Sequence, residues 1–236
     1  MASDFFQFKQ FKVYHNQCGM KVGTDAVLIG SWCATDNIDS VLDVGTGSGI
    51  ISLMIAQRSH ADILAIDVDM HASIQAKSNF SISPWHDRLS VLHADFSDYV
   101  AQTTEKYDLI VSNPPYFTNG VLAPCKKRSV ARHADSLSYQ QLFEGVVQIL
   151  NDKGRFALIL PVDAETEIEE LARKADLYLI RKCRVFPKPD GVVKRLMWEF
   201  SKTESDIKEE SLIIELDRHV YSSDYINLTK DFYLKM

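Results

Sequence analysis

The sequence predicts an α/β protein with a mostly parallel sheet of seven strands and helices on both faces of the sheet. Three observations favour this fold class. Short apolar runs alternate with helix-like stretches between residues 40 and 200, which is typical of strand–helix–strand units. A glycine-rich segment, GTGSG, directly follows the first of these runs. An aspartate ends or follows each of the next two runs, at the edge where parallel sheets bind ligands.

The elements of the first half can be placed in chain order. Residues 5–22 mix aromatic and basic side chains, so we expect a short hairpin or an irregular arm there. Thr24 and Asp25 precede an apolar stretch and indicate a helix start. Apolar runs and the stretches between them then predict strands at 40–44, 62–66, 89–93 and 108–111, and helices at 50–58 and 70–80.

The second half continues the alternation. Two prolines stop the fourth strand, because proline lacks an N–H donor and fixes its own φ. Residues 139–150 place Leu142, Val146 and Ile149 on one side, as an amphipathic helix does. The further elements expected are a strand at 154–160, a helix at 163–175, strands at 177–186 and 193–200, a tail strand at 212–216 and a last helix near 223–232.

Composition limits the class of protein. The chain has 236 residues, 46% hydrophobic and 25% charged, which suits one soluble globular domain with a sizeable core. No apolar run approaches the roughly 18 residues of a membrane span, and the N-terminal segment lacks the features of a secretion signal. Within the single domain 1–236 we expect an N-terminal cap at 1–35, a core at 36–200, and a C-terminal strand and helix at 201–236.

The four cysteines are spread along the chain. Cys18, Cys33, Cys125 and Cys183 form no CxxC pair. We therefore expect no metal site and no disulfide framework, and a cytoplasmic location. We also expect no membrane partner, and a monomer or a weak homodimer.

Net charge and local charge point in different directions. The net charge of −6 argues weakly against a nucleic-acid partner. However, residues 181–195 carry six basic side chains and one acid, and residues 126–133 carry four basic side chains and no acid. A phosphate backbone responds to charges within a Debye length, so these two segments predict local nucleic-acid contacts.

The glycine segment predicts a ligand site. Gly45 and Gly47 allow a tight turn and a close approach of the backbone to a ligand, and a strand precedes them while a helix follows. Asp67 ends the next strand, about 20 residues on, where a carboxylate can accept bonds from both hydroxyls of a ribose. The pattern indicates a cofactor that contains a nucleoside. A plain strand-to-helix turn is the alternative.

The spacing bears on which cofactor is bound. A nicotinamide dinucleotide prefers GxGxxG around its pyrophosphate, whereas this loop is GxGxG and is preceded by Asp43. An acid there suits the cationic ligand S-adenosylmethionine (SAM) and would repel a pyrophosphate. Asp95 could bind the adenine amino group, with Phe96 beside the ring. Asp95 could equally cap the short helix that follows it.

The segment SNPPYF, residues 112–117, follows the fourth strand and suggests the chemistry. The side-chain oxygen of Asn113 and the backbone carbonyl of Pro114 can accept the two hydrogens of a planar amine such as the adenine NH₂. Pro114 and Pro115 hold these acceptors stiffly, so little reorganisation accompanies methyl transfer. The ring of Tyr116 can stack on the flat substrate, worth about 1–3 kcal/mol per base. A proline-terminated strand with a turn asparagine is the structural alternative.

These motifs, with others along the chain, resemble a known family. The segments FKQFKVYHNQCGMKVGTDAVLIGSW, VLDVGTGSGIISLMIAQR, SNPPYF, RSVARH, VFPKPDGVVKRLMWEF and LTKDFYL occur in this order. The set is similar to the bacterial tRNA(Val) adenine-N6-methyltransferases, class I SAM-dependent enzymes with an NPPY motif and a Rossmann-like fold. The resemblance spans nearly the whole chain. It implies SAM as cofactor, tRNA as partner, and methylation of the adenine next to the anticodon.

The resemblance also implies roles for individual residues. The catalytic motif would be Asn113, Pro114, Pro115 and Tyr116. Residues that hold SAM would be Gly45, Gly47, Asp67 and Asp95, and candidates to cap its methionine end would be Lys21, Thr24 and Asp25. The residue patterns described above add Asp43 and Phe96 to this set. Contacts to RNA would come from Arg128, Arg132, His133, Lys188, Lys194 and Arg195. Helix capping, for Thr24 and Asp25, and a solvated surface, for the basic residues, are the alternatives.

Other functions stay open from the residues alone. An enzyme with the same motif could act on guanine N2 of ribosomal RNA or on a glutamine amide of a protein. The same fold could also host a nucleotide-dependent oxidoreductase. A non-catalytic binding module is disfavoured, because the NPPY motif is intact.

Overall fold

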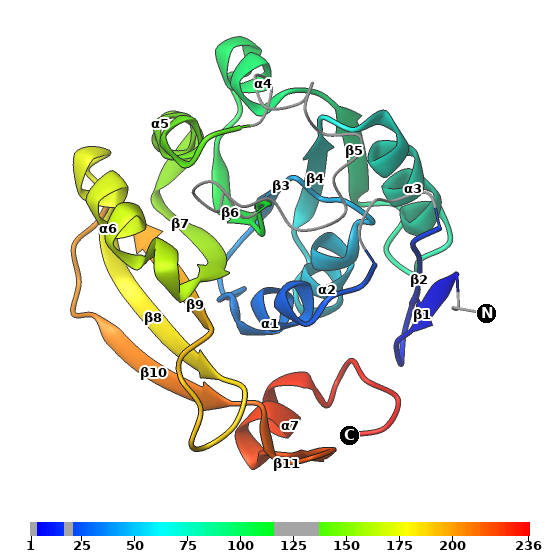
Figure 1. Ribbon diagram of the computed structural model, residues 1–236. Coiled ribbons are helices and arrows are strands. Elements are labelled where there is room, and N and C mark those ends of the chain that lie inside the picture. The colour runs from blue at the N-terminus through cyan, green and yellow to red at the C-terminus, as the bar shows by residue number, and fades with distance from the viewer. Residues whose placement is uncertain (1–3, 17–20, 116–136) are drawn as a thin grey trace, which may run out of the picture.

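A sheet of eight strands forms the centre of the computed structural model, which describes residues 4–16, 21–115 and 137–236. The strand order is β10-β8-β9-β7-β6-β3-β4-β5 (Figure 1). All neighbouring pairs are parallel except those that β9 makes with β7 and β8. The strands span Ser40–Val44 (β3), Asp62–Asp67 (β4), Leu89–His93 (β5), Tyr107–Ser112 (β6), Leu150–Pro161 (β7), Tyr178–Phe186 (β8), Arg195–Ser201 (β9) and Lys208–Ile213 (β10).

The predicted class, a mostly parallel α/β sheet, is confirmed, but the sheet has eight strands where the sequence predicts seven. The additional strand is β10, which pairs in parallel with β8; it overlaps the tail strand expected at 212–216 but begins at Lys208 and ends at Ile213. Only Leu212 of β10 is buried, because β10 lies at the edge of the sheet. Its charged, exposed sequence therefore carries little of the apolar pattern that marks a core strand.

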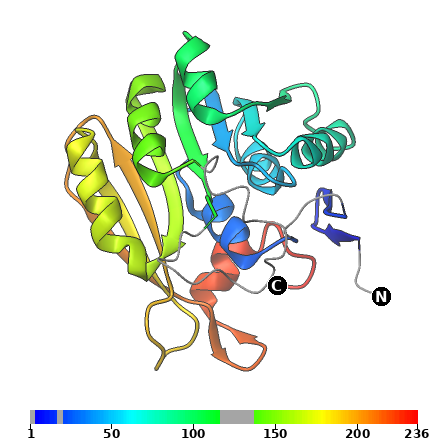
Figure 2. The same ribbon diagram turned by 45° about the horizontal axis from the view of Figure 1, so that its top comes forward.

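Helices cover both faces of the sheet, as predicted (Figures 1 and 2). Each face has its own buried cluster of apolar side chains. One cluster includes residues of α1 (Thr24–Trp32), α2 (Ile50–Arg58) and α3 (Met70–Ser81). The other includes residues of α4 (Phe96–Gln102), α5 (Tyr139–Ile149) and α6 (Glu165–Lys174).

Side-chain caps set the starts of three of these helices. The carboxylate of Asp69 accepts a bond from the backbone N–H of His71 at the start of α3. Ser138 and Gln141 cap one another at the start of α5, in a capping box. Asp95 caps α4. Each cap satisfies N–H groups that the helix itself leaves without partners.

The N-terminal arm and the C-terminal tail meet beside α3 and α1. The arm is the expected hairpin, formed by β1 (Phe5–Gln7) and β2 (Lys12–Tyr14). The tail contains a second hairpin, β11 (Glu215–Asp217) and β12 (Val220–Tyr221), and the helix α7 (Ser223–Thr229), which packs against α1. None of the helices in the described parts of the chain has both the length and the apolar character needed to cross a membrane.

Candidate active site

The predicted glycine loop and the SNPPYF segment begin at adjacent points of the sheet. The register of β3 and β6 pairs Val44 with Ser112, so Gly45 and Asn113 follow neighbouring positions. The hydroxyl of Ser112 donates to the carbonyl of Val44 at 2.8 Å and fixes this alignment. The chain runs from β3 outward to β5 in one direction and from β6 to β7 in the other. The two segments therefore lie at the switch point where open α/β sheets bind ligands.

The glycine loop, residues 45–49, has a conformation that needs glycine. Gly45, Gly47 and Gly49 have φ angles of 74°, 57° and 82°, which are strained for residues with a Cβ. A Cβ on Gly49 would lie 2.5 Å from the Phe80 ring, so this glycine also allows the loop to pack on α3. A Cβ on Gly45 or Gly47 would meet no atom of the described residues within 4 Å. These two glycines therefore leave open space beside the backbone.

Asp67 holds the glycine loop from the end of β4. Its Oδ2 accepts a bond from the backbone N–H of Gly47, and its Oδ1 accepts one from the N–H of Asp69, both at 2.8 Å. Burial raises the pKa of the Asp67 carboxyl, while these two N–H groups oppose the rise. The side chain is partly exposed. Each oxygen retains a second lone pair, so Asp67 can both support the loop and accept bonds from ligand hydroxyls.

Asp43 lies fully buried beneath the loop. Its Oδ2 accepts bonds from the hydroxyls of Thr46 and Ser52, both at 2.7 Å. Its Oδ1 has no hydrogen-bond partner among the described residues. Burial raises the pKa of Asp43 to about 6, although the two hydroxyls lower it. Asp43 therefore acts on the loop through Thr46 and the first turn of α2, which sequence reasoning did not foresee.

The SNPPYF corner is described up to its second proline. Asn113 is half-buried, Pro114 is buried and Pro115 is exposed. Asn113 directly follows β6, at the ligand-binding edge of the sheet. This is where the proposed acceptor pair of Asn113 and Pro114 has to lie. Tyr116 is outside the described residues.

The two predicted adenine contacts have other roles in the structure. The carboxylate of Asp95 caps α4 by accepting bonds from the N–H groups of Ser97 and Asp98 at 2.7 and 3.2 Å. The capping alternative is therefore the one that the structure supports, although Asp95 is partly exposed. Phe96 is 4% exposed and packs against Gly145 of α5. Its ring belongs to the core under α4 and offers almost no surface to a ligand.

The start of α1 is tied to the same edge of the sheet. Arg195 begins β9, and its Nε donates to Asp25 Oδ2 at 2.9 Å. Gly23 is the N-cap residue and no side chain caps the helix, so neither Thr24 nor Asp25 serves as its cap. Lys21 and Thr24 are exposed. Arg195, a predicted RNA contact, is thus paired with Asp25, which the sequence predicts as a SAM contact.

The basic segment 181–195 is mostly neutralised within the fold. Arg181 pairs with Glu199 and Glu210, and the buried Lys182 pairs with Glu165 and Glu169. Further along, Arg184 pairs with Glu165. Lys188 and Lys194, which precede β9, are exposed. The count of charges within the segment could not predict these ion pairs, because the acidic partners come from α6, β9 and β10. Arg128, Arg132 and His133 lie outside the described residues.

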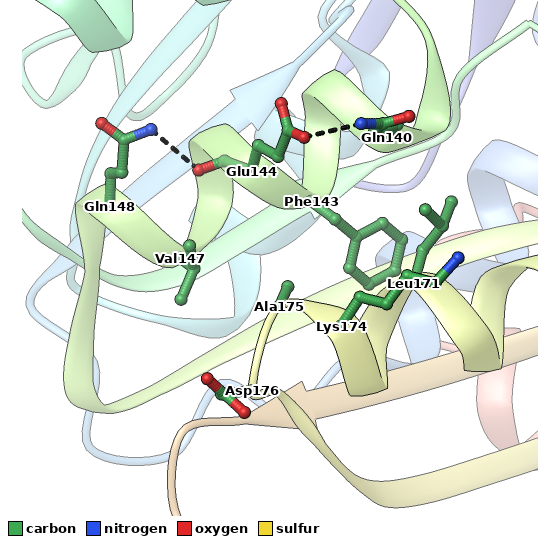
Figure 3. Close-up of a pocket in the computed structure, with 9 residues that line it drawn as sticks. All are labelled: Gln140, Phe143, Glu144, Val147, Gln148, Leu171, Lys174, Ala175 and Asp176. Atoms are coloured by element: carbon green, nitrogen blue, oxygen red, sulfur yellow. Dashed lines mark hydrogen bonds between the residues drawn. The ribbon is translucent and has the colours of Figure 1, made fainter.

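A groove between α5 and α6 is a separate feature from this edge (Figure 3). It has a volume of about 580 Å³, and Figure 3 shows Phe143 of α5 beside Leu171 of α6, with Val147 of α5 on the side of Ala175. The groove runs along α5 from Gln140 to Gln148 and reaches the C-terminal end of α6. Its lining includes neither Asn113 nor a residue of the glycine loop. In the described part of the chain, no three His, Cys, Asp or Glu side chains are grouped so as to hold a metal ion.

The fold and the loop geometry define a methyltransferase-type α/β protein. A family model described as the methyltransferase small domain matches residues 20–165. Proteins named tRNA1(Val) (adenine(37)-N6)-methyltransferase are similar over the whole chain. The one from Bacteroides fragilis is 45% identical and the one from Trichodesmium erythraeum 41%, each with 100% of both chains covered. The chain therefore belongs to the family of these methyltransferases, as the sequence motifs suggest.

Solved structures support the fold. A predicted O-methyltransferase from Agrobacterium tumefaciens has a TM-score of 0.71 at 18% identity, covering 88% of this chain and 96% of that one. The ribosomal protein L11 methylase of Lactobacillus delbrueckii has a TM-score of 0.55 at 19% identity, and the match covers 76% of this chain and 77% of that one.

SAM is the cofactor of this methyltransferase, and the residues at the edge of the sheet fit it. Gly45 and Gly47 leave open space beside the loop, and Asp67 is a half-exposed carboxylate at the end of β4. The buried Asp43 adds negative potential when ionised, which favours a cationic ligand over a pyrophosphate.

Proposed function

We propose that the protein transfers a methyl group from SAM to N6 of adenine 37, next to the anticodon of tRNA1(Val). The observation that carries the proposal is the pairing of Val44 with Ser112, which places the Asn113 corner beside the glycine loop. Relatives with 100% coverage of both chains bear the name of this activity. The enzyme would work in the cytoplasm, where tRNA is modified.

The corner would act by accepting hydrogen bonds. SAM, when bound, supplies an electrophilic methyl group on its sulfonium. The Asn113 side-chain oxygen and the Pro114 carbonyl accept the two N6 hydrogens, which raises the electron density on the nitrogen and directs its lone pair. Both acceptors are fixed before reaction, so they stabilise the charge that develops on N6 without reorganisation. The alkylated amine is acidic enough to lose its proton to water, so no strong base is needed.

The glycine loop, Asp67 at the end of β4 and the connection between β8 and β9 would hold the reactants. Asp67 accepts bonds from the ribose hydroxyls of SAM while it supports Gly47. Lys188 and Lys194 attract the phosphate backbone from the exposed β8–β9 connection. Tyr116 is proposed to stack on the adenine. An adenine in an anticodon loop is already unpaired, so the enzyme does not have to open a duplex.

The test is methyl transfer to two transcripts. Purified protein is incubated with labelled SAM and tRNA1(Val), or with the same tRNA carrying guanine at position 37, and the nucleosides are separated. The proposal predicts labelled N6-methyladenosine from the first transcript and no transfer to the second. Label in N2-methylguanosine would support the alternative ribosomal RNA activity, and transfer to both transcripts would contradict the assigned position.

A further inference from the structure

Asn79 connects three parts of the fold through one buried side chain. It lies in the second half of α3 and is 0% exposed. Its Oδ1 accepts a bond from the backbone N–H of Tyr14 at 2.9 Å, and its Nδ2 donates to the carbonyl of Tyr14 at 2.9 Å. The same Nδ2 donates to the carbonyl of Ser48 at 2.8 Å. Asn79 thus links α3 to the N-terminal arm and to the glycine loop.

The loop is held from α3 by two consecutive residues. Asn79 binds the carbonyl of Ser48, and Phe80 packs against Gly49 so closely that a Cβ there would lie 2.5 Å from the ring. Asp67 holds Gly47 from the other side. Loss of the Asn79 amide would leave the Ser48 carbonyl buried without its donor. A buried carbonyl without a donor is unfavourable, so the loop backbone would move to find another partner.

The N-terminal arm is fixed at its far side by the C-terminal tail. Phe8 and Tyr233 form a β-bridge, and the N–H of Lys9 donates to the carbonyl of Phe232 at 2.8 Å. With that side anchored, the Asn79 bonds set the distance between Tyr14 and the glycine loop. The chain continues from Tyr14 to the start of α1, where Asp25 is paired with Arg195 at the ligand-binding edge.

We propose that Asn79 is a positioning residue for SAM, an inference that rests on the proposed function. It fixes the position of the glycine loop relative to the N-terminal arm, so that the backbone beside Gly47 is in place before the cofactor binds. All three of its bonds go to backbone groups outside its own helix. An asparagine that only stabilised α3 would have no need of partners on both of these segments.

The test compares two variants of Asn79 with a matched control. Asn79→Ala removes all three bonds, whereas Asn79→Asp keeps the shape and the acceptor but removes both donated bonds. Ser83→Ala is the control. Ser83 is 6% exposed and follows α3, and among the described residues its hydroxyl bonds to the nearby carbonyl of Phe80 and the N–H of Trp85 alone. SAM affinity is measured by calorimetry, the free energy of unfolding with urea, and hydrogen exchange of the Gly47 and Gly49 amides without cofactor.

Both Asn79 variants should raise the dissociation constant for SAM about ten-fold, equivalent to one lost hydrogen bond. Their loop amides should exchange faster, and the KM for SAM should rise more than kcat falls. Ser83→Ala should lower stability without changing SAM affinity. Wild-type affinity in the folded variants would overturn the inference, and so would failure of both variants to fold. If the wild-type protein itself does not bind SAM, the proposed function fails instead.

Discussion

Replacing Asp67 by asparagine tests whether the carboxylate that supports the glycine loop also binds the cofactor. The carboxylate accepts two backbone N–H bonds at 2.8 Å. An asparagine oxygen can accept only one of them, since the amide nitrogen would face the other N–H. A hydrogen bond to a charged group contributes about 1.5–3 kcal/mol, so loss of the bond to Gly47 corresponds to about 10- to 150-fold in affinity. Loss of a bond to the ribose would act in the same direction.

The assay is calorimetric titration of the variant with SAM and with its demethylated product. Both ligands should bind more weakly by similar factors, because we propose that Asp67 binds the ribose hydroxyls of the nucleoside end that they share. The matched control is Asp69→Ala, which removes the α3 cap but not the backbone N–H that Asp67 accepts. It should lower stability by about 0.5–2 kcal/mol and leave binding unchanged. Unaltered affinity in Asp67→Asn would refute the reasoning and remove Asp67 from the site.

Three further predictions concern the buried Asp43, the strained backbone at Gly49, and the two lysines of the connection between β8 and β9. Because burial raises the pKa of Asp43 to about 6 from 3.8, the native protein binds this proton more tightly than the unfolded chain. The stability of Asp43→Asn relative to wild type should therefore increase by roughly 2 kcal/mol between pH 4 and pH 6; parallel urea titrations showing a constant difference would contradict this. Gly49→Ala, at φ 82°, should lose at least about 1–2 kcal/mol of stability and bind SAM more weakly; a wild-type unfolding midpoint would argue against a strained loop. Replacing Lys188 and Lys194 together by alanine should reduce the salt dependence of tRNA binding by up to about two units of slope, whereas Lys153→Ala, at the opposite edge, should not; equal slopes in filter-binding assays would exclude these contacts.

The parts of the site that the sequence could predict depend on local spacing. The GxGxG loop, Asp67 and the asparagine–proline corner each follow an apolar strand, and parallel strands bring their ends to one edge. The register of β3 with β6 then brings the two motifs together. Such short-range patterns predict the position of the site correctly because the fold class fixes which strands pair.

The parts that could not be predicted depend on contacts between distant residues. Phe96 looks like a ring beside an adenine, but it packs into the core under Gly145. The basic segment looks like a phosphate-binding surface, yet Lys182 is buried against Glu165 and Glu169. The link from Asn79 to Ser48 spans 31 positions and has no motif of its own. Neither charge counts nor spacing can indicate which side chains a fold will pair.

The most direct test of the central claim is a paired measurement on Asn113→Ala. SAM binding is titrated by calorimetry, and methyl transfer to tRNA1(Val) is followed by nucleoside analysis on the same preparation. If Asn113 supplies an acceptor to N6 beside a separate cofactor loop, transfer should be abolished while SAM affinity stays within about two-fold of wild type, since Asp67 and the loop provide the binding. Formation of N6-methyladenosine at the wild-type rate by the variant would contradict the account.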